Sequence, residues 1–151
     1  MPRHTTVREG NHMDTKLAGE IAALINSQNQ LTTHLTAESV LQEQDNYLYI
    51  LEEKSLVGVV EVKKVQWYQC EIRHLSVKNK RKGCGTKLLE MAEQYAKKQY
   101  FACIVQCTIK EGNKESEGLF LRYRYIKCIG FHNAASGNNV YVYQKSISAI
   151  E

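Results

Sequence analysis

The feature that most constrains the fold is a change in hydrophobic period at Thr86. Before this residue, short segments alternate apolar and polar side chains, which is typical of strands. After it, apolar residues return at the spacing of one helix face, at Leu88, Leu89, Ala92, Tyr95 and Ala96. The chain must therefore combine strands with helices.

A buried strand is predicted after this helix. The segment from Phe101 to Ile109 (FACIVQCTI) is almost continuously apolar, which is typical of a strand buried on both faces of a sheet. We expect it to lie centrally and parallel to a strand at Gln66–Val77. The remaining expected elements are a strand at Thr5–Arg8, a helix capped by Asp14, a short helix capped by Thr36 and continuing through Gln44, a hairpin of Tyr47–Leu51 with Leu56–Val62, a helix at Lys114–Tyr125, and strands at Cys128–Phe131 and Val140–Lys145.

This order of elements predicts the fold class. An antiparallel hairpin that leads into a strand–loop–helix–strand unit indicates a mixed α/β (α+β) fold rather than a doubly wound one. The 151 residues contain no repeat or linker and a single proline, at position 2. One domain over residues 1–151 is therefore expected.

The composition disfavours a membrane-spanning or secreted protein and indicates the cellular compartment. No apolar run exceeds five residues, and the first twenty residues lack the apolar core of a signal peptide, so membrane spanning and secretion are disfavoured. The five cysteines form no CxxC pair and have no histidine at zinc spacing. They indicate reduced thiols in the cytoplasm, and no metal site is expected.

Charge is distributed unevenly along the chain. Residues 1–60 contain four basic and eight acidic side chains, a net charge of −4, whereas the whole chain carries +4. The remaining residues therefore carry +8. This asymmetry predicts an anionic partner for the later part and a cationic partner for the earlier part, the alternative being chance segregation of solvated charges.

The densest chemical signal is the loop Lys78–Thr86 (KNKRKGCGT), between a predicted strand and the first turn of a predicted helix. Glycines let the backbone approach a ligand closely, and helix N-terminal N–H groups attract anions. The loop is neither a Walker loop nor a GxGxxG motif. It predicts a phosphate site, the alternative being a tight turn with a basic solvated rim.

The surroundings of this loop resemble a known family. The stretch Glu71–Val77 (EIRHLSV), the pattern Lys80-x-x-Gly83-x-Gly85-Thr86-x-Leu88-Leu89, the buried strand, the next helix and Gly130-Phe131 are together similar to the GNAT superfamily of N-acetyltransferases. The resemblance covers about residues 47–145. It departs from the family pattern at Lys80, where glutamine or arginine is usual.

The resemblance implies a coenzyme site. In this family a mostly antiparallel mixed sheet, flanked by about four helices, splays around acetyl-coenzyme A, and the loop wraps its pyrophosphate. The backbone of Leu75 and Val77 would pair with the pantetheine arm. Coenzyme binding is further expected at Asn113 and at the loop residues Lys80, Arg81, Lys82, Gly83, Cys84, Gly85 and Thr86.

The resemblance also implies catalytic residues. Acetyl transfer needs a neutral amine, and Glu71 falls where some members hold a general base; the alternative is a rim carboxylate paired with Arg73 or a lysine. His74 has a suitable intrinsic pKa but is read as a partly buried strand histidine. A tyrosine would protonate the departing thiolate, and Tyr125 is favoured over Tyr123, although either can be a helix tyrosine with a packed ring.

The sequence therefore predicts an acyltransferase that moves acetyl from acetyl-coenzyme A to a primary amine of a cationic acceptor, such as a polyamine, another small amine or a protein lysine. The acidic first part of the chain, including Glu38, Glu43 and Asp45, would border the acceptor. Two other interpretations remain open: a nucleic-acid-binding module that uses the basic loop, disfavoured because no aromatic platform accompanies the lysines, and a noncatalytic acyl-coenzyme A sensor. A homodimer is also left open.

Overall fold

The computed structural model describes residues 5–7, 13–29, 31, 33–78 and 83–148. These residues form two compact units, one comprising Met1–Val62 and His74–Ala92 and the other Lys63–Arg73 and Glu93–Glu151. Below they are called the first and second units. The expectation of one domain over residues 1–151 stays a prediction.

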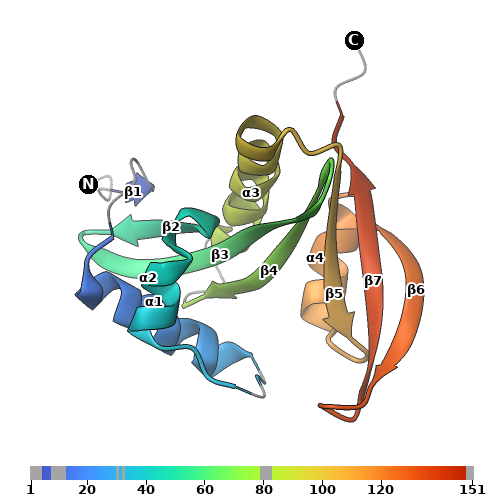
Figure 1. Ribbon diagram of the computed structural model, residues 1–151, viewed down its shortest axis with the longest axis horizontal. Coiled ribbons are helices and arrows are strands. Elements are labelled where there is room, and N and C mark those ends of the chain that lie inside the picture. Colours follow the sequence, from blue (N-terminus) through green and yellow to red (C-terminus); the bar gives the residue numbers. More distant parts are fainter. Residues whose placement is uncertain (1–4, 8–12, 30, 32, 79–82, 149–151) are drawn as a thin grey trace. The chain divides into compact units, whose positions relative to one another are not determined.

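The first unit is a sheet in the order β1-β2-β3-β4 with two helices on one face (Figure 1). Its elements are β1 (Thr5–Val7), α1 (Thr15–Gln28), α2 (Ala37–Gln42), a 3₁₀ turn (Gln44–Asn46), β2 (Tyr47–Glu52), most of β3 (Ser55–Gln66), the end of β4 (Gln69–Val77) and the first half of α3 (Cys84–Tyr100). β1 and β3 are antiparallel to β2. Both predicted N-caps are confirmed, since Asp14 accepts the N–H of Leu17 and Thr36 closes a capping box with Ser39.

Packing of α1 and α2 against β2 and β3 forms the core of this unit. The buried cluster joins Ile21 and Ile25 of α1 and Val40 of α2 to Tyr49 and Val59 of the strands. Tyr49 pairs with Val59 across the hairpin, so both lie on the helix-covered face. The sheet therefore has one face committed to α1 and α2.

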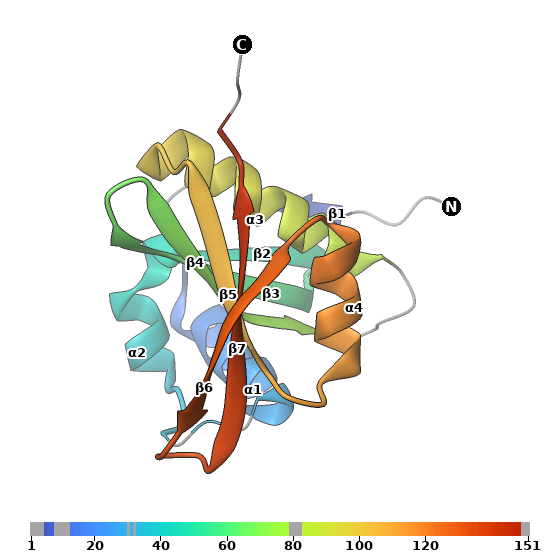
Figure 2. The same ribbon diagram turned by 90° about the vertical axis from the view of Figure 1, so that its right-hand side faces the viewer.

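The second unit is built on the strand order β4-β5-β7-β6 (Figure 2). Its further elements are β5 (Ile104–Lys110), α4 (Lys114–Arg122), β6 (Ile126–Asn133) and β7 (Asn138–Ser146). β5 is parallel to β4, as predicted, whereas β7 is antiparallel to both β5 and β6. The predicted mixed, mostly antiparallel sheet is confirmed.

Several predicted boundaries are wrong. β3 ends at Gln66, and the chain turns at Trp67-Tyr68 before β4 begins. The turn was missed because Tyr68 has a left-handed backbone there, and glycine or asparagine, the residues that commonly adopt this conformation, are absent from the turn. The segment predicted as a strand from Phe101 starts at Ile104, since α3 continues to Tyr100. α4 ends at Arg122 rather than Tyr125.

The burial predicted for the central strand is also wrong. Val105, Cys107 and Ile109 of β5 are buried, whereas Ile104, Thr108 and Lys110, which alternate with them, are exposed. β5 is therefore covered on one face only. Phe101 and Ile104, two apolar residues of the predicted run, are exposed.

Candidate active site

The edge of β4 that faces away from β3 is the main feature of the candidate site in the first unit. The N–H of Lys78 donates to the carbonyl of Val57 on β3 at 2.9 Å. Because successive residues of a strand direct their main-chain groups to opposite edges, Val77 and Leu75 direct theirs away from β3. On that edge β4 pairs with β5 only from Gln69 to Glu71, and no strand pairs with it beyond Glu71 within the described residues. The predicted pantetheine-binding groups thus lie on an edge without a neighbouring strand.

One side chain already binds this edge. Gln28, the last residue of α1, donates from Nε2 to the carbonyl of Val77 at 2.7 Å, and its Oε1 accepts the N–H of Val77 at 3.1 Å. The sequence gives no signal for this contact, because the two residues are 49 positions apart.

The glycine loop leads from this edge into α3. Gly83 is exposed and has a φ of +66°, a left-handed backbone, and its carbonyl accepts the first helical N–H, from Lys87, at 3.1 Å. The N–H groups of Cys84, Gly85 and Thr86 lie in the first turn, where a helix offers no carbonyl of its own. Lys80, Arg81 and Lys82, the predicted cationic residues, lie outside the described residues.

Close packing brings the start of α3 onto the first unit's sheet. A Cβ atom on Gly58 of β3 would lie 2.7 Å from Sγ of Cys84 and 2.7 Å from Cδ1 of Leu88. Cys84 is therefore buried against β3, and burial is the main reason that its thiol pKa is raised. Of the groups on Cys84, only the main chain is suited to a ligand at the loop.

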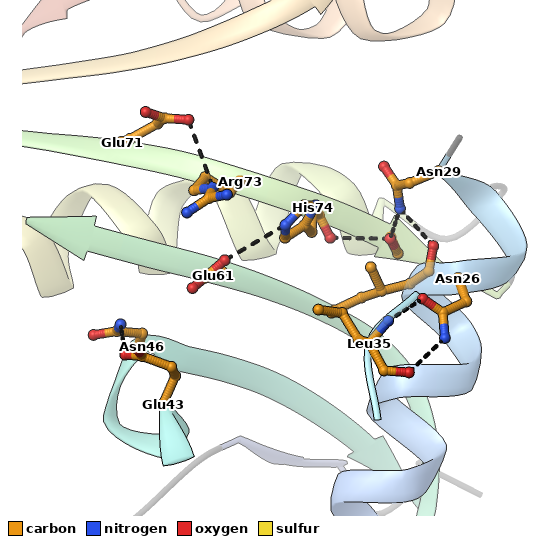
Figure 3. Close-up of polar contacts among 11 residues, drawn as sticks. Asn26, Asn29, Leu35, Glu43, Asn46, Glu61, Glu71, Arg73 and His74 are labelled. Atoms are coloured by element: carbon orange, nitrogen blue, oxygen red, sulfur yellow. Dashed lines mark hydrogen bonds and ion pairs between the residues drawn. The ribbon is translucent and has the colours of Figure 1, made fainter. Parts of the chain in front are cut away.

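Glu71, the predicted base, lies in the second unit beside Arg73. Its Oε1 is 3.6 Å from Nε of Arg73, and both side chains are partly exposed (Figure 3). The ion pair with Arg73, which the alternative interpretation of Glu71 predicted, is therefore present. A partly exposed carboxylate on β4 remains accessible to an amine.

A second carboxylate on the neighbouring strand was missed by sequence reasoning. Glu61 of β3 is only 5% exposed, and its Oε1 lies 3.6 Å from Nε2 of His74 on β4 (Figure 3). His74 has a φ of +55° inside a strand, which is uncommon for a residue with a Cβ. The left-handed residue interrupts the regular alternation of faces that was predicted along β4. Strained backbone of this kind is found preferentially at functional sites.

Tyr125, the favoured candidate for the acid, is held inside the second unit. Its hydroxyl donates to Oε2 of Glu93 at 2.9 Å, and Nζ of Lys145 lies 2.8 Å from Oε1 of the same carboxylate. Only 2% of Tyr125 is exposed, and its ring packs edge-on against Phe120. Burial first, and then the charge of Glu93, raise the pKa of Tyr125 well above its usual value. These contacts give Tyr125 a structural role, and its role as the acid stays a prediction.

The two remaining predicted residues mark the ends of α4. Asn113 is the N-cap, and its Oδ1 accepts the N–H of Ser116 at 3.2 Å. Tyr123 is the C-cap, and its N–H reaches the carbonyls of Leu119 and Phe120. The side chain of Tyr123 is half-buried, in contrast to that of Tyr125.

Within the described part of the chain, no group of three or more histidine, cysteine, aspartate or glutamate side chains could hold a metal ion. None of the described helices combines the length and apolar character needed to cross a bilayer.

Residues 17–124 match the sequence model of the acetyltransferase (GNAT) family. The chain belongs to this family. The GNAT acetyltransferase fold and an acyltransferase activity, both predicted from the loop and its surroundings, are thereby confirmed. No curated protein matches the chain.

Solved structures share the fold at low sequence identity. Ard1 from Thermoplasma volcanium has a TM-score of 0.78 at 18% identity, covering 96% of this chain and 99% of that one. The yncA putative acetyltransferase from Salmonella typhimurium, solved with acetyl-CoA, has 0.78 at 15%, covering 95% and 94%. A ribosomal-protein-alanine N-acetyltransferase from Brucella melitensis has 0.77 at 18%, covering 94% and 99%.

Proposed function

We propose that this GNAT acetyltransferase moves the acetyl group of acetyl-coenzyme A to a primary amine of a cationic acceptor. The observation that carries the proposal is the edge of β4 at Leu75 and Val77, with which no strand among the described residues pairs and from which the chain leads through Gly83 into the first turn of α3. Main-chain amides on such an edge suit the amide-containing pantetheine arm. The N–H groups in the first turn of α3 suit the phosphates of coenzyme A.

Two structural relatives support the donor and the class of acceptor. The yncA protein was solved with acetyl-CoA, and the Brucella protein is named as acting on an alanine of a ribosomal protein. The acidic character of residues 1–60 favours a cationic acceptor here. A polyamine and a protein amine both satisfy this requirement.

The chemistry needs two proton transfers. The acceptor nitrogen must lose a proton before its lone pair attacks the thioester carbonyl carbon, because an alkyl ammonium with a pKa of about 10 has no lone pair. Attack leaves a positively charged nitrogen. As the C–S bond breaks, this nitrogen loses its second proton and the thiolate of coenzyme A takes up one, so the products are a neutral amide and a thiol. Glu71 is proposed as the base, directly or through water, and Tyr125 or Tyr123 as the acid. His74, beside the buried carboxylate of Glu61, is a second candidate base.

Thiol release from acetyl-coenzyme A tests the function. The acceptors are spermidine, a peptide with one lysine and a blocked N-terminus, and a peptide with a free N-terminus and no lysine. At least one amine should accelerate thiol release. Binding of coenzyme A without acceleration by any amine would favour the noncatalytic sensor instead.

The Glu71→Gln variant tests the base. We expect kcat/KM at pH 7 to fall by roughly a hundredfold, and the loss to shrink as the pH approaches that at which the free amine becomes neutral. Profiles from about pH 6 to 9.5 are compared with those of Glu90→Gln, which alters an exposed carboxylate of α3. Equal profiles for Glu71→Gln and the wild type would assign Glu71 to its ion pair with Arg73 alone.

A further inference from the structure

Gln28 makes an unusual pair of contacts. Its carboxamide donates to the carbonyl of Val77 and accepts from the N–H of the same residue, at 2.7 and 3.1 Å. A single amide thus supplies both bonds that a neighbouring strand would make at this position. The pantetheine arm of coenzyme A carries amides of the same chemistry.

We propose that Gln28 belongs to the coenzyme site: its carboxamide occupies the pantetheine position on β4 in the free protein, and coenzyme A displaces it. The inference rests on the proposed function. A main-chain N–H has a single hydrogen to donate, so Val77 cannot bind a pantetheine carbonyl fully while it donates to Oε1 of Gln28. Binding of the arm at Val77 therefore requires that Gln28 leave.

The position of Gln28 allows it to leave without disturbing the core. Gln28 is exposed at the end of α1, so water can satisfy the displaced carboxamide. A hollow of about 350 Å³ borders it and gives the displaced side chain room; its lining is Glu20, Ala23, Leu24, Ser27, Gln28 and Lys78.

Neighbouring amides hold the end of α1 independently of Gln28. Asn29 donates from Nδ2 to Oγ of Ser76 at 3.0 Å and to the carbonyl of Ile25 at 2.8 Å. Asn26 binds both main-chain groups of Leu35, at 2.8 and 2.9 Å (Figure 3). These contacts remain when Gln28 rotates away. The carboxamide on Val77 is thus a removable contact beside fixed ones.

Calorimetric titration with coenzyme A tests the displacement. Gln28→Met keeps the length of the side chain but cannot form the amide pair, and Gln28→Ala removes the side chain beyond Cβ. Because the free protein no longer has a competing amide, both variants should bind coenzyme A more tightly, by roughly three- to tenfold. Asn29→Ala is the matched control, since it alters an adjacent carboxamide that does not contact Val77, and it should not tighten binding. Circular dichroism confirms that each variant is folded.

The possible outcomes separate the two proposals. Unchanged or weaker binding by both folded Gln28 variants, with a wild-type protein that binds coenzyme A, overturns the displacement and leaves the proposed function intact. Absence of coenzyme A binding by every form overturns both. As an independent readout, addition of coenzyme A to wild-type ¹⁵N-labelled protein should shift the side-chain NH₂ signals of Gln28 and speed their hydrogen exchange. Signals of Gln28 that stay unchanged at saturation would also contradict displacement.

Discussion

Gly83 illustrates how a single backbone conformation can prepare a ligand site. Its φ of +66° lies in the left-handed region, and a Cβ built on it would have no atom of the described residues within 4 Å. A side chain there is therefore opposed by backbone conformation and not by crowding. Replacement should change the course of the loop into α3 without opening the core.

We expect Gly83→Val to weaken coenzyme A binding by at least about tenfold, because the valine shifts the backbone out of the left-handed region. Titration calorimetry measures this directly. Gly118→Val is the matched control, since Gly118 lies in α4, has no positive φ and also has open space around its Cβ position. Equal affinity of the wild type and a folded Gly83→Val protein would remove the loop from the coenzyme site.

Tyr125 has a structural role that can be measured apart from catalysis. Tyr125→Phe removes a buried donor from Glu93 and leaves that carboxylate with Lys145. The free energy of unfolding should fall by about 1–2 kcal/mol, as measured by urea denaturation. Tyr123→Phe, at the half-buried C-cap of α4, should leave it nearly unchanged. If both variants have the stability of the wild type, the bond to Glu93 contributes nothing net.

Among helices and strands, sequence patterns predicted the features that depend only on residues close together in the chain. The change of period and the glycine pair predicted the order of β4, loop and α3, and Asp14 and Thr36 predicted two helix starts. The left-handed backbone of His74 was not predictable, because its neighbours in sequence are ordinary strand residues. Gln28 and Val77 meet only through the packing of α1 beside β4, so no window of sequence contains both.

The surroundings of Tyr125 could not be predicted from the sequence for a similar reason. The family resemblance implied that Tyr125, the last residue of the predicted helix, is available to the coenzyme, whereas in the structure its hydroxyl donates to Glu93 of α3. The helix pattern continued to Tyr125 in the sequence, but α4 ends three residues earlier, and Arg124 takes a φ of +71°. Side-chain partners from distant elements decide such a residue's environment, and periodicity does not report them.

Gly58 couples β3 to the first turn of α3. A methyl group there would lie 2.7 Å from the side chains of both Cys84 and Leu88, so these side chains, or the helix that carries them, must shift. Gly58→Ala should lower the free energy of unfolding by roughly 1–3 kcal/mol and should also weaken coenzyme A binding, because the first-turn N–H groups move with the helix. Chemical denaturation and calorimetry measure the two effects. Gly118→Ala, a helix position with open space, should instead be neutral or stabilising by about 0.5–1 kcal/mol. A loss of stability without any loss of affinity would contradict the coupling.

At the scale of the whole molecule, the limits of the two units fall inside regular elements. The chain passes from one unit to the other between Val62 and Lys63 in β3, between Arg73 and His74 in β4, and between Ala92 and Glu93 in α3. Domain boundaries normally fall in exposed linkers that few contacts cross. None of these three crossings is a linker.

We therefore expect the protein to unfold in one cooperative transition, as the predicted single domain requires. Two strands and a helix would each have to break in their middle before one unit could unfold alone. Hydrogen exchange by mass spectrometry across a urea titration tests this, with peptides from α1 reporting the first unit and peptides from β5 reporting the second. Their midpoints should coincide, and saturating coenzyme A should raise both together, because a ligand bound to the folded state stabilises every part that unfolds with it. Exchange of β5 at a lower urea concentration than α1, with or without coenzyme A, would show instead that the second unit unfolds independently.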